Sequence, residues 1–207
     1  MSIAEDRTFL TYQGANRKFP EVLAEAARQR KLAGARHLHL GWAPPLDTAA
    51  ELLGELRENG CTISMDTGWH EAWLTDKRAM EVLRRVDLFF PNEAEGSRMT
   101  GERGVDAILR AFERAGVGRV ALKLGSDGAA LLWNGEILRV AAHTVRSVDT
   151  TGAGDCFDAG FLHYWLRGES PLNCLRAANF CGAACTRGYG GIEAFPEAAA
   201  VDSICGR

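Results

Sequence analysis

The stretch from Asp149 to Phe157, with the sequence DTTGAGDCF, constrains the fold of this chain more than any other. Its glycines lie around the start of residues 153–166, a long run without proline that carries apolar side chains at helical spacing. We therefore predict a glycine-rich turn that opens a helix. Residues 145–148, which precede the stretch, are expected to form a short strand.

A turn of this kind is suited to binding an anion. The first N–H groups of a helix have no partner within the helix, and the helix dipole adds partial positive charge at the same end. Gly152 and Gly154 carry no Cβ, so the backbone and a ligand can approach each other closely. The sequence thus predicts an anion site at the start of this helix.

Asp155 lies in the first turn of the predicted helix. A carboxylate there would repel a phosphate that stays bound, but it is useful if the anion is transient and a hydroxyl beside it must lose a proton. Phosphoryl transfer to an alcohol has these requirements. The alternative is that Asp155 only stabilises the helix start. The whole nine-residue pattern favours the catalytic interpretation.

The same nine residues closely resemble the second signature of the ribokinase-like (PfkB) sugar kinase family, D-T-x-G-A-G-D-x-F, and match it at every fixed position. The resemblance implies an ATP-dependent kinase that transfers the γ-phosphoryl group to a carbohydrate hydroxyl. It further implies that Asp155 is the catalytic base and that the anion hole is formed by the backbone of Gly152, Ala153 and Gly154.

Asn92 and Glu95 stand three residues apart where a predicted strand passes into a helix, so their side chains can face the same way. A carboxylate and an amide that act through water suit Mg²⁺, which keeps much of its hydration shell. Helix capping explains the pair equally well. In the family that the chain resembles, N-x-x-E at this point assists the magnesium–phosphate site, which implies that role for both residues.

The segment Lys123–Gly128 ends a buried strand with a tight turn. By itself it is compatible with a surface turn and an extended lysine. The resemblance implies ATP contacts in this turn, at Lys123, Gly125, Ser126 and Gly128, with Asp127 facing solvent.

The resemblance implies two more ligand contacts. Asn179 occupies a place where the family contacts the adenine side of ATP, although its spacing to Arg187 is one residue shorter than in common relatives. Asp149 and Thr151, together with residues 188–191, correspond to a region that often binds a monovalent cation such as K⁺. Their oxygen atoms are suitable ligands for a hard cation, but nothing in the sequence requires one.

Strands and helices alternate along the chain, which predicts an α/β fold of three layers, Rossmann-like and here ribokinase-like: a mostly parallel sheet with helices on both faces. Asn134-Gly135 predicts a hairpin between strands at 129–133 and 137–140. The other predicted strands are 7–12, 36–41, 61–65, 87–90 and 119–124, and the helices include 20–32, one capped by Asp47, 76–86, 104–116 and 171–186.

Ligands of such folds bind beyond the carboxyl ends of the strands. The polar motifs are expected there, at Asp66, Asn92–Glu95, Gly125–Gly128 and Gly152–Asp155. Asp66 opens a segment, Asp-Thr-Gly-Trp, that lies where relatives approach the substrate or the phosphates. This segment lacks the Arg that is typical of keto-deoxygluconate kinases, and the sequence does not identify the sugar.

The resemblance covers the C-terminal two-thirds of a usual family member. Residues 1–16 resemble the last lid strand and its return, and residues 17–207 resemble the nucleotide-binding and catalytic domain. The lid of the family excludes water from the site. Two interpretations stay open: a sugar kinase, or a truncated, non-catalytic nucleotide-binding remnant. A nucleoside kinase of the same family is a further alternative. Exposed sheet edges predict a homodimer or association with a chain that supplies the lid.

Composition excludes several other classes. Hydrophobic residues make up 46% of the 207 residues, which allows a sizeable core, and a net charge of −3 gives no indication of nucleic-acid or membrane-surface binding. No apolar run approaches membrane-spanning length and the first residues show no signal-peptide pattern, so we expect a cytoplasmic protein with a small-molecule sugar substrate.

Several motifs of other functional classes are missing from the sequence or incomplete. The turn lacks the third glycine of a dinucleotide-binding fingerprint, and the chain has no G-x-x-x-x-G-K-[ST] motif, which excludes a P-loop kinase. The six cysteines form no C-x-x-C pair and are interpreted as small buried hydrophobic residues. His37 and His39 are expected on one face of a strand, without a third metal ligand in view.

Overall fold

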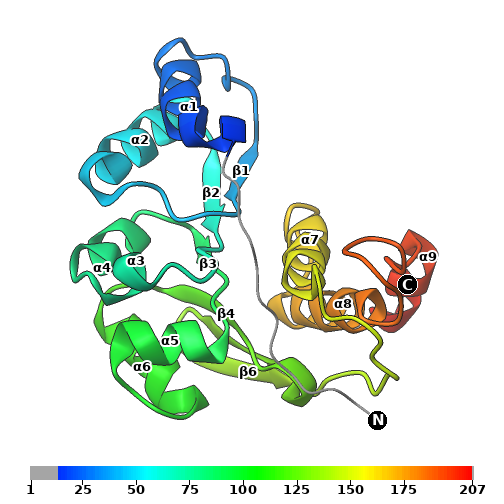
Figure 1. Ribbon diagram of the computed structural model, residues 1–207. Helices are drawn as coiled ribbons and strands as arrows, with labels where there is room; N and C mark the ends of the chain where they lie inside the picture. The colour runs from blue at the N-terminus through cyan, green and yellow to red at the C-terminus, as the bar shows by residue number, and fades with distance from the viewer. Residues whose placement is uncertain (1–13, 207) are drawn as a thin grey trace.

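The computed structural model describes residues 14–206. The strand predicted at residues 7–12, and with it most of the segment 1–16, lies outside the described residues. Within them, the chain forms one mixed sheet between two layers of helices, as predicted (Figure 1).

The described residues form a sheet of six strands, whose order in space is the same as their order in the chain. The first four strands run parallel and the last two add an antiparallel hairpin. The strands are β1 (His37–Leu40), β2 (Thr62–Met65), β3 (Leu88–Phe89), β4 (Arg119–Lys123), β5 (Ala129–Trp133) and β6 (Glu136–Val140). Asn134 and Gly135 join the hairpin with φ of 51° and 87°, so the predicted two-residue turn is confirmed.

Helices cover both faces of the sheet (Figure 1). One layer comprises α1 (Phe19–Arg28), α2 (Leu46–Glu58), α3 (Glu71–Thr75), α4 (Arg78–Leu83), α5 (Glu93–Thr100) and α6 (Val105–Arg114). The other comprises α7 (Ala153–Trp165), α8 (Pro171–Cys185) and α9 (Ala198–Ile204). Two short 3₁₀ helices, η1 (Gly14–Lys18) and η2 (Gly125–Asp127), complete the described elements.

Alternation along the strands separates two hydrophobic cores. Phe89 and Val120 belong to the core beneath the first layer, whereas their neighbours Leu88, Phe90 and Ala121 belong to the core beneath α7 and α8. All five are fully buried. Successive side chains of a strand point to opposite faces, so a strand covered on both sides must be apolar throughout. This explains why residues 87–90 are nearly all apolar.

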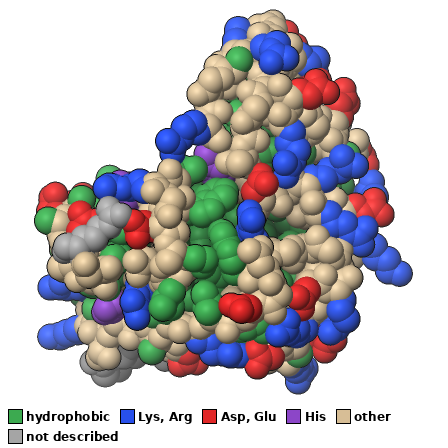
Figure 2. Space-filling model, turned by 180° about the vertical axis from the view of Figure 1, so that it is seen from behind, with side chains coloured by type: hydrophobic (Ala, Val, Ile, Leu, Met, Phe, Trp, Pro, Cys, Tyr) green, Lys and Arg blue, Asp and Glu red, His purple; other side chains and the backbone are tan. Residues whose placement is uncertain are grey.

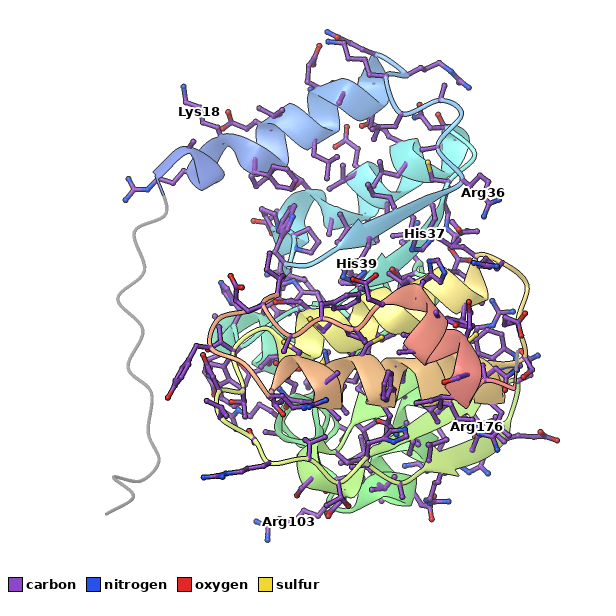
Figure 3. All side chains as sticks on the ribbon, turned by 90° about the vertical axis from the view of Figure 1, so that its right-hand side faces the viewer. Lys18, Arg36, His37, His39, Arg103 and Arg176 are labelled. Atoms are coloured by element: carbon purple, nitrogen blue, oxygen red, sulfur yellow. The ribbon has the colours of Figure 1, made fainter. Side chains whose placement is uncertain are left out.

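The layer of α7–α9 covers the sheet unevenly. Helix α8 packs on β5 and β6, while the opposite end of the sheet, on β1, presents polar side chains to α7. His37 and His39 lie on β1 and turn toward α7 (Figure 3). Seen from behind, the molecule is hollowed between its two helical layers, and apolar side chains gather in the hollow (Figure 2).

No strand forms at residues 145–148, so this prediction is wrong. The N–H groups of Val148 and Asp149 donate instead to the carbonyl of Thr186, at 2.7 and 3.2 Å, at the end of α8. A helix end thus provides the hydrogen-bond partner that a strand would have taken from a neighbouring strand. The following turn is therefore attached to α8 and not to the sheet.

Two helix predictions also need correction. Asp47 lies within the first turn of α2, and the cap position is Pro45, which has no side chain that can accept a hydrogen bond. The helix predicted at residues 76–86 is shorter, and a separate helix, α3, precedes it. Asp76 ends α3 with extended backbone angles and accepts the N–H of Arg78 at its Oδ1, so it interrupts the predicted helix.

Candidate active site

Polar side chains meet at the carboxyl ends of β2, β3 and β4. The backbone N–H of Lys123 donates to the carbonyl of Pro91 at 2.9 Å, and Asn92 pairs with Lys123 in an isolated parallel bridge. The Nζ of Lys123 lies 2.6 Å from Oδ2 of Asp66, which follows β2. The expectation that these motifs share one edge of the sheet is confirmed.

The predicted turn before α7 is present. Gly152 is the residue before the helix and has φ of 74° and ψ of 0°, a left-handed conformation that favours glycine. A Cβ at this position would lie 2.7 Å from Cα and 2.8 Å from the carbonyl oxygen of Gly191. Only glycine satisfies both the conformation and the contact.

The turn is fastened to the loop that follows α8. Oδ1 of Asp149 accepts the N–H and the hydroxyl of Thr151 at 2.9 and 2.8 Å, and Oδ2 accepts the N–H of Gly190 at 3.1 Å. The thiols of Cys156 and Cys185 both donate to the carbonyl of Gly191, at 3.3 and 3.1 Å. These bonds connect the Asp149 segment with residues 188–191, the two segments that sequence analysis grouped as a cation site.

The cysteines are structural, as predicted. All six are free thiols and five are buried. Burial, reinforced by the neighbouring Cys185, raises the pKa of Cys156 to about 12, so its thiol keeps the proton that it donates to Gly191. Cys156 thus acts as a hydrogen-bond donor that supports the turn.

Asp155 is exposed at the first turn of α7. It borders an open hollow of about 480 Å³, which is lined by Gly152, Asp155, Cys156, Ala159, Gly191, Ile192 and Phe195. The hollow thus brings Asp155 and Gly152, the residue before α7, to one surface. The lining is mostly apolar, which suits a site that must exclude water from a reacting group.

Asn92 and Glu95 form a capping box at the start of α5. Oδ1 of Asn92 accepts the N–H of Glu95, and Oε2 of Glu95 accepts the N–H of Asn92, both at 2.9 Å. Glu95 is 3% exposed, and burial raises its pKa. The pair therefore caps α5, which is the alternative interpretation of N-x-x-E. Capping also holds the carboxyl group of Glu95 at the sheet edge where Asn92 pairs with Lys123.

The Gly125–Gly128 turn and Asn179 converge on the end of β6. Gly128 has φ of 96°, and a Cβ there would lie 2.1 Å from the carbonyl oxygen of Val140. The side-chain amide of Asn179 donates to the same carbonyl at 2.8 Å and to that of Ala141 at 3.4 Å. Gly125, Ser126 and Asp127 are exposed. The amide of Asn179 thus holds the backbone that flanks the turn.

Sequence reasoning missed Asp158. This residue lies on α7, three positions after Asp155, and is 1% exposed. Its Oδ1 is 3.4 Å from Nζ of Lys123, and its Oδ2 has no hydrogen-bond partner and lies 3.7 Å from Nε2 of His39. An Asp in the apolar stretch from Cys156 to Leu162 was the available signal.

Comparisons with known proteins identify the family of this chain. A family profile described as pfkB family carbohydrate kinase matches residues 2–198. The three-layer fold, the glycine-rich turn before α7 and the Asn92–Glu95 pair lie within this match. The chain belongs to the PfkB family of carbohydrate kinases.

Individual relatives support this assignment. The chain is 35% identical over 177 residues to an ATP-dependent ribose-1-phosphate kinase of Halopiger xanaduensis, which covers 86% of this chain and 57% of that protein. The structure of Arabidopsis thaliana ribokinase complexed with ribose and ATP matches with a TM-score of 0.71 and 28% identity, over 91% of this chain and 58% of that one.

A third match has a bound cation. Vibrio cholerae fructokinase in its fructose-, ADP- and calcium-bound form matches with a TM-score of 0.68 and 26% identity, over 82% of this chain and 59% of that one. The chain spans about half the length of the curated relatives it matches. None of the helices in residues 14–206 has the length and apolar character needed to cross a bilayer.

Proposed function

We propose that this chain transfers the γ-phosphoryl group of ATP to a hydroxyl of a carbohydrate, with Asp155 as the catalytic base. The observation that carries the proposal is the position of Asp155: an exposed carboxylate in the first turn of α7, directly after the left-handed Gly152 and beside an open hollow. A hydroxyl, a base and a set of backbone N–H groups can meet there.

The reaction follows from this arrangement. Asp155 takes the proton of the acceptor hydroxyl while the oxygen of that hydroxyl forms a bond to the γ-phosphorus. The bond from that phosphorus to the bridging oxygen breaks, and the electron pair leaves with ADP. The N–H groups of Gly152, Ala153 and Gly154 stabilise the negative charge on the transferred group. The positive end of the α7 dipole adds to this stabilisation.

ATP contacts are proposed for the turn after β4, at Lys123, Gly125, Ser126 and Gly128, and for Asn179. The exposure of Gly125 and Ser126 leaves their backbone accessible to a nucleotide. Asn179 supports this region through Val140, the strand end against which Gly128 packs. Arabidopsis thaliana ribokinase, which binds ATP in its structure, matches this part of the chain by fold.

The residues present fit a hydrated Mg²⁺. Within residues 14–206, no three His, Cys, Asp or Glu side chains are grouped to hold a metal ion. Mg²⁺ needs only one or two carboxylates when it keeps its waters and contacts phosphate oxygens. Glu95 and Asn92 would hold it through water at this sheet edge. When bound, Mg²⁺ neutralises part of the charge on the phosphates.

Asp149 and Thr151 are proposed to contribute to a monovalent cation site such as one for K⁺. The bonds that connect Asp149 with Gly190 bring carbonyl and carboxylate oxygens of two loops together. Oxygen-rich loops of this kind suit hard cations. A cation here would support the anion turn by holding both loops in place.

The proposal is tested by Mg-ATP-dependent phosphorylation of a pooled panel of sugars, sugar phosphates and nucleosides. The test variant is Asp155→Asn, and Glu136→Gln is the matched control, because Glu136 is an exposed carboxylate beside the hairpin turn on β6. Turnover that is lost only in Asp155→Asn supports the proposal. Mg-ATP stabilisation without any turnover would instead support the alternative, a non-catalytic nucleotide-binding chain.

A further inference from the structure

A cluster of buried charged groups lies directly behind the anion turn. Lys123 at the end of β4 reaches Asp66 at 2.6 Å and Asp158 of α7 at 3.4 Å. The side chains of Lys123, Asp66 and Asp158 are only 13%, 14% and 2% exposed. Buried charges are costly unless they are paired, so such a cluster needs an explanation.

The ammonium of Lys123 also lies against the anion turn itself. A Cβ built on Gly154 would be 3.5 Å from Nζ of Lys123, and no other heavy atom lies within 4 Å of that position apart from the helix's own backbone and chain neighbours. The lysine is therefore the side chain in contact with the second glycine of the turn. A positive charge therefore lies beside the first turn of α7.

The cluster contains two carboxyl groups for one lysine, and they differ in protonation. Burial raises the pKa of Asp158 well above its usual range, with opposition from the charge of Lys123. Burial acts on the pKa of Asp66 in the same direction. The charge and the hydrogen bond of the nearer Lys123 ammonium oppose burial, and the pKa of Asp66 is lowered. The two shifts run in opposite directions: the surroundings favour the ionised form of Asp66 and the protonated form of Asp158.

The groups that face the cluster from other elements do not change this balance. His39 of β1 approaches Asp158 at 3.7 Å, but burial lowers the pKa of its imidazole, which stays neutral at pH 7. Glu95 of α5 acts on Lys123 through its charge, without a direct bond, and Asp155 acts on His39 in the same way. These directions favour one cation, one carboxylate and one neutral carboxyl group in the cluster.

We propose that Asp66 and Asp158 are positioning residues that hold the Lys123 ammonium beside Gly154, where it supplies a fixed positive charge to the transferring phosphoryl group. This inference rests on the proposed function. A lysine side chain is a flexible four-carbon chain, and two partners on different elements restrict its ammonium to one position. A fixed charge stabilises the developing negative charge without reorganisation during the reaction.

A neutral Asp158 favours anion binding at this site. Two ionised carboxylates would give the cluster a net negative charge, which would weaken the attraction of the site for an anion. With a neutral Asp158, the carboxylate of Asp66 pairs with the Lys123 ammonium, and the carboxyl group of Asp158 only orients that ammonium. The amide of Asn has the same shape as a protonated Asp158, whereas an apolar side chain makes no hydrogen bond.

The proposal predicts an ordered series of kinetic effects. Lys123→Met should lower kcat by about 10²-fold or more and also raise the KM for ATP, because the charge acts on the bound phosphates and more strongly on the transition state. Asp158→Leu should lower kcat by about 10-fold or more, and Asp158→Asn should rescue most of that loss. Lys77→Met, a change of an exposed lysine at the start of α4, is the control and should leave kcat unchanged.

Two measurements test the cluster without any enzyme activity. The infrared spectrum at pH 7 should contain a buried carboxylic acid band that is lost in Asp158→Asn and kept in Asp155→Asn. Titration with inorganic triphosphate should show about 10-fold weaker binding to Lys123→Met than to Lys77→Met. If both results hold and no sugar is phosphorylated, the proposed function fails while the arrangement of the cluster stands.

The proposal is overturned by any of three results. These are a carboxylic acid band that is absent from the wild-type chain or unchanged in Asp158→Asn, equal triphosphate binding by the two lysine variants, and equal losses of kcat in Asp158→Asn and Asp158→Leu. A purely structural role of Asp158 would lower the melting temperature of its variants and leave kcat of the folded protein unchanged.

Discussion

The Cα atom of Gly191 lies 2.7 Å from the point that a Cβ on Gly152 would occupy. Two glycines from segments 39 residues apart therefore pack backbone to backbone, and Asp149, Cys156 and Cys185 hold them there through hydrogen bonds. The shape of the anion turn depends on this contact as much as on the local sequence.

Gly152→Ala should destabilise the fold and damage anion binding. A Cβ would meet Gly191, and alanine disfavours the left-handed conformation at this position. The free energy of unfolding should fall by about 2–4 kcal/mol in urea titrations. Gly54→Ala is the matched control, because Gly54 lies inside α2 with open space around it. The free energy of unfolding of this variant should rise by up to about 1 kcal/mol. Equal effects of both changes would contradict the role of the contact.

Asp155→Asn should abolish phosphoryl transfer and leave nucleotide binding in place. The amide cannot take the proton of the acceptor, so kcat should fall by about 10²–10⁴-fold. Asp155 is exposed, so its replacement removes no buried interaction and the melting temperature should not change. Isothermal titration with Mg-ATP should give an affinity within about threefold of the wild type. Simultaneous loss of binding and turnover in a folded variant would argue against a base.

Glu95→Gln separates helix capping from metal binding. Glutamine can accept the N–H of Asn92 as glutamate does, so the capping box and the free energy of unfolding should persist within about 0.5 kcal/mol. The carboxylate is lost, so the Mg²⁺ concentration needed for half-maximal ATP binding should rise several-fold.

Asn92→Ala is the complementary change, because it removes the side-chain acceptor for the N–H of Glu95. It should cost about 0.5–2 kcal/mol of stability, measured by urea unfolding. A Glu95→Gln variant with wild-type Mg²⁺ dependence would show that Asn92 and Glu95 only cap α5.

The stability of the fold should decrease as pH falls from 6.5 to about 4, in part because of His37. Its ring contacts Thr62 Oγ1 and Ser64 Oγ at 2.8 Å each, and burial, followed by the nearby His39, lowers its pKa to about 4. In the unfolded chain the ring takes a proton below about 6.5. Protons therefore bind more readily to the unfolded state within this window, and stability rises with pH.

The measurement is the difference between the wild type and His37→Gln. Between pH 6.5 and pH 4 the free energy of unfolding of the wild type should fall by about 1–2 kcal/mol more than that of the variant. Solvent screening limits this difference because the ring is only part-buried. Chemical unfolding at several pH values gives both slopes. Parallel slopes would show that His37 takes up its proton over the same pH range in the folded and the unfolded state.

Several elements followed directly from short-range sequence patterns. Asn134-Gly135 predicts its own hairpin because few other residues adopt the positive φ values of that turn. The run after Gly152 predicts α7 because its apolar residues repeat at the helical period. At residues 145–148 the same kind of reasoning failed, because a strand also requires a neighbouring strand, which a local pattern does not reveal.

The order of elements, the glycine-rich turn and Asp155 at the start of its helix could be predicted, since they depend on residues close in the chain. The partners of these groups could not, because they come from distant parts of the chain. Lys123, Asp66 and Asp158 come from positions up to 92 residues apart, and the pairing of β4 with β3 and the packing of α7 on the sheet bring them together. Their protonation depends on burial and on distances of a few ångströms, which arise only when the chain is folded.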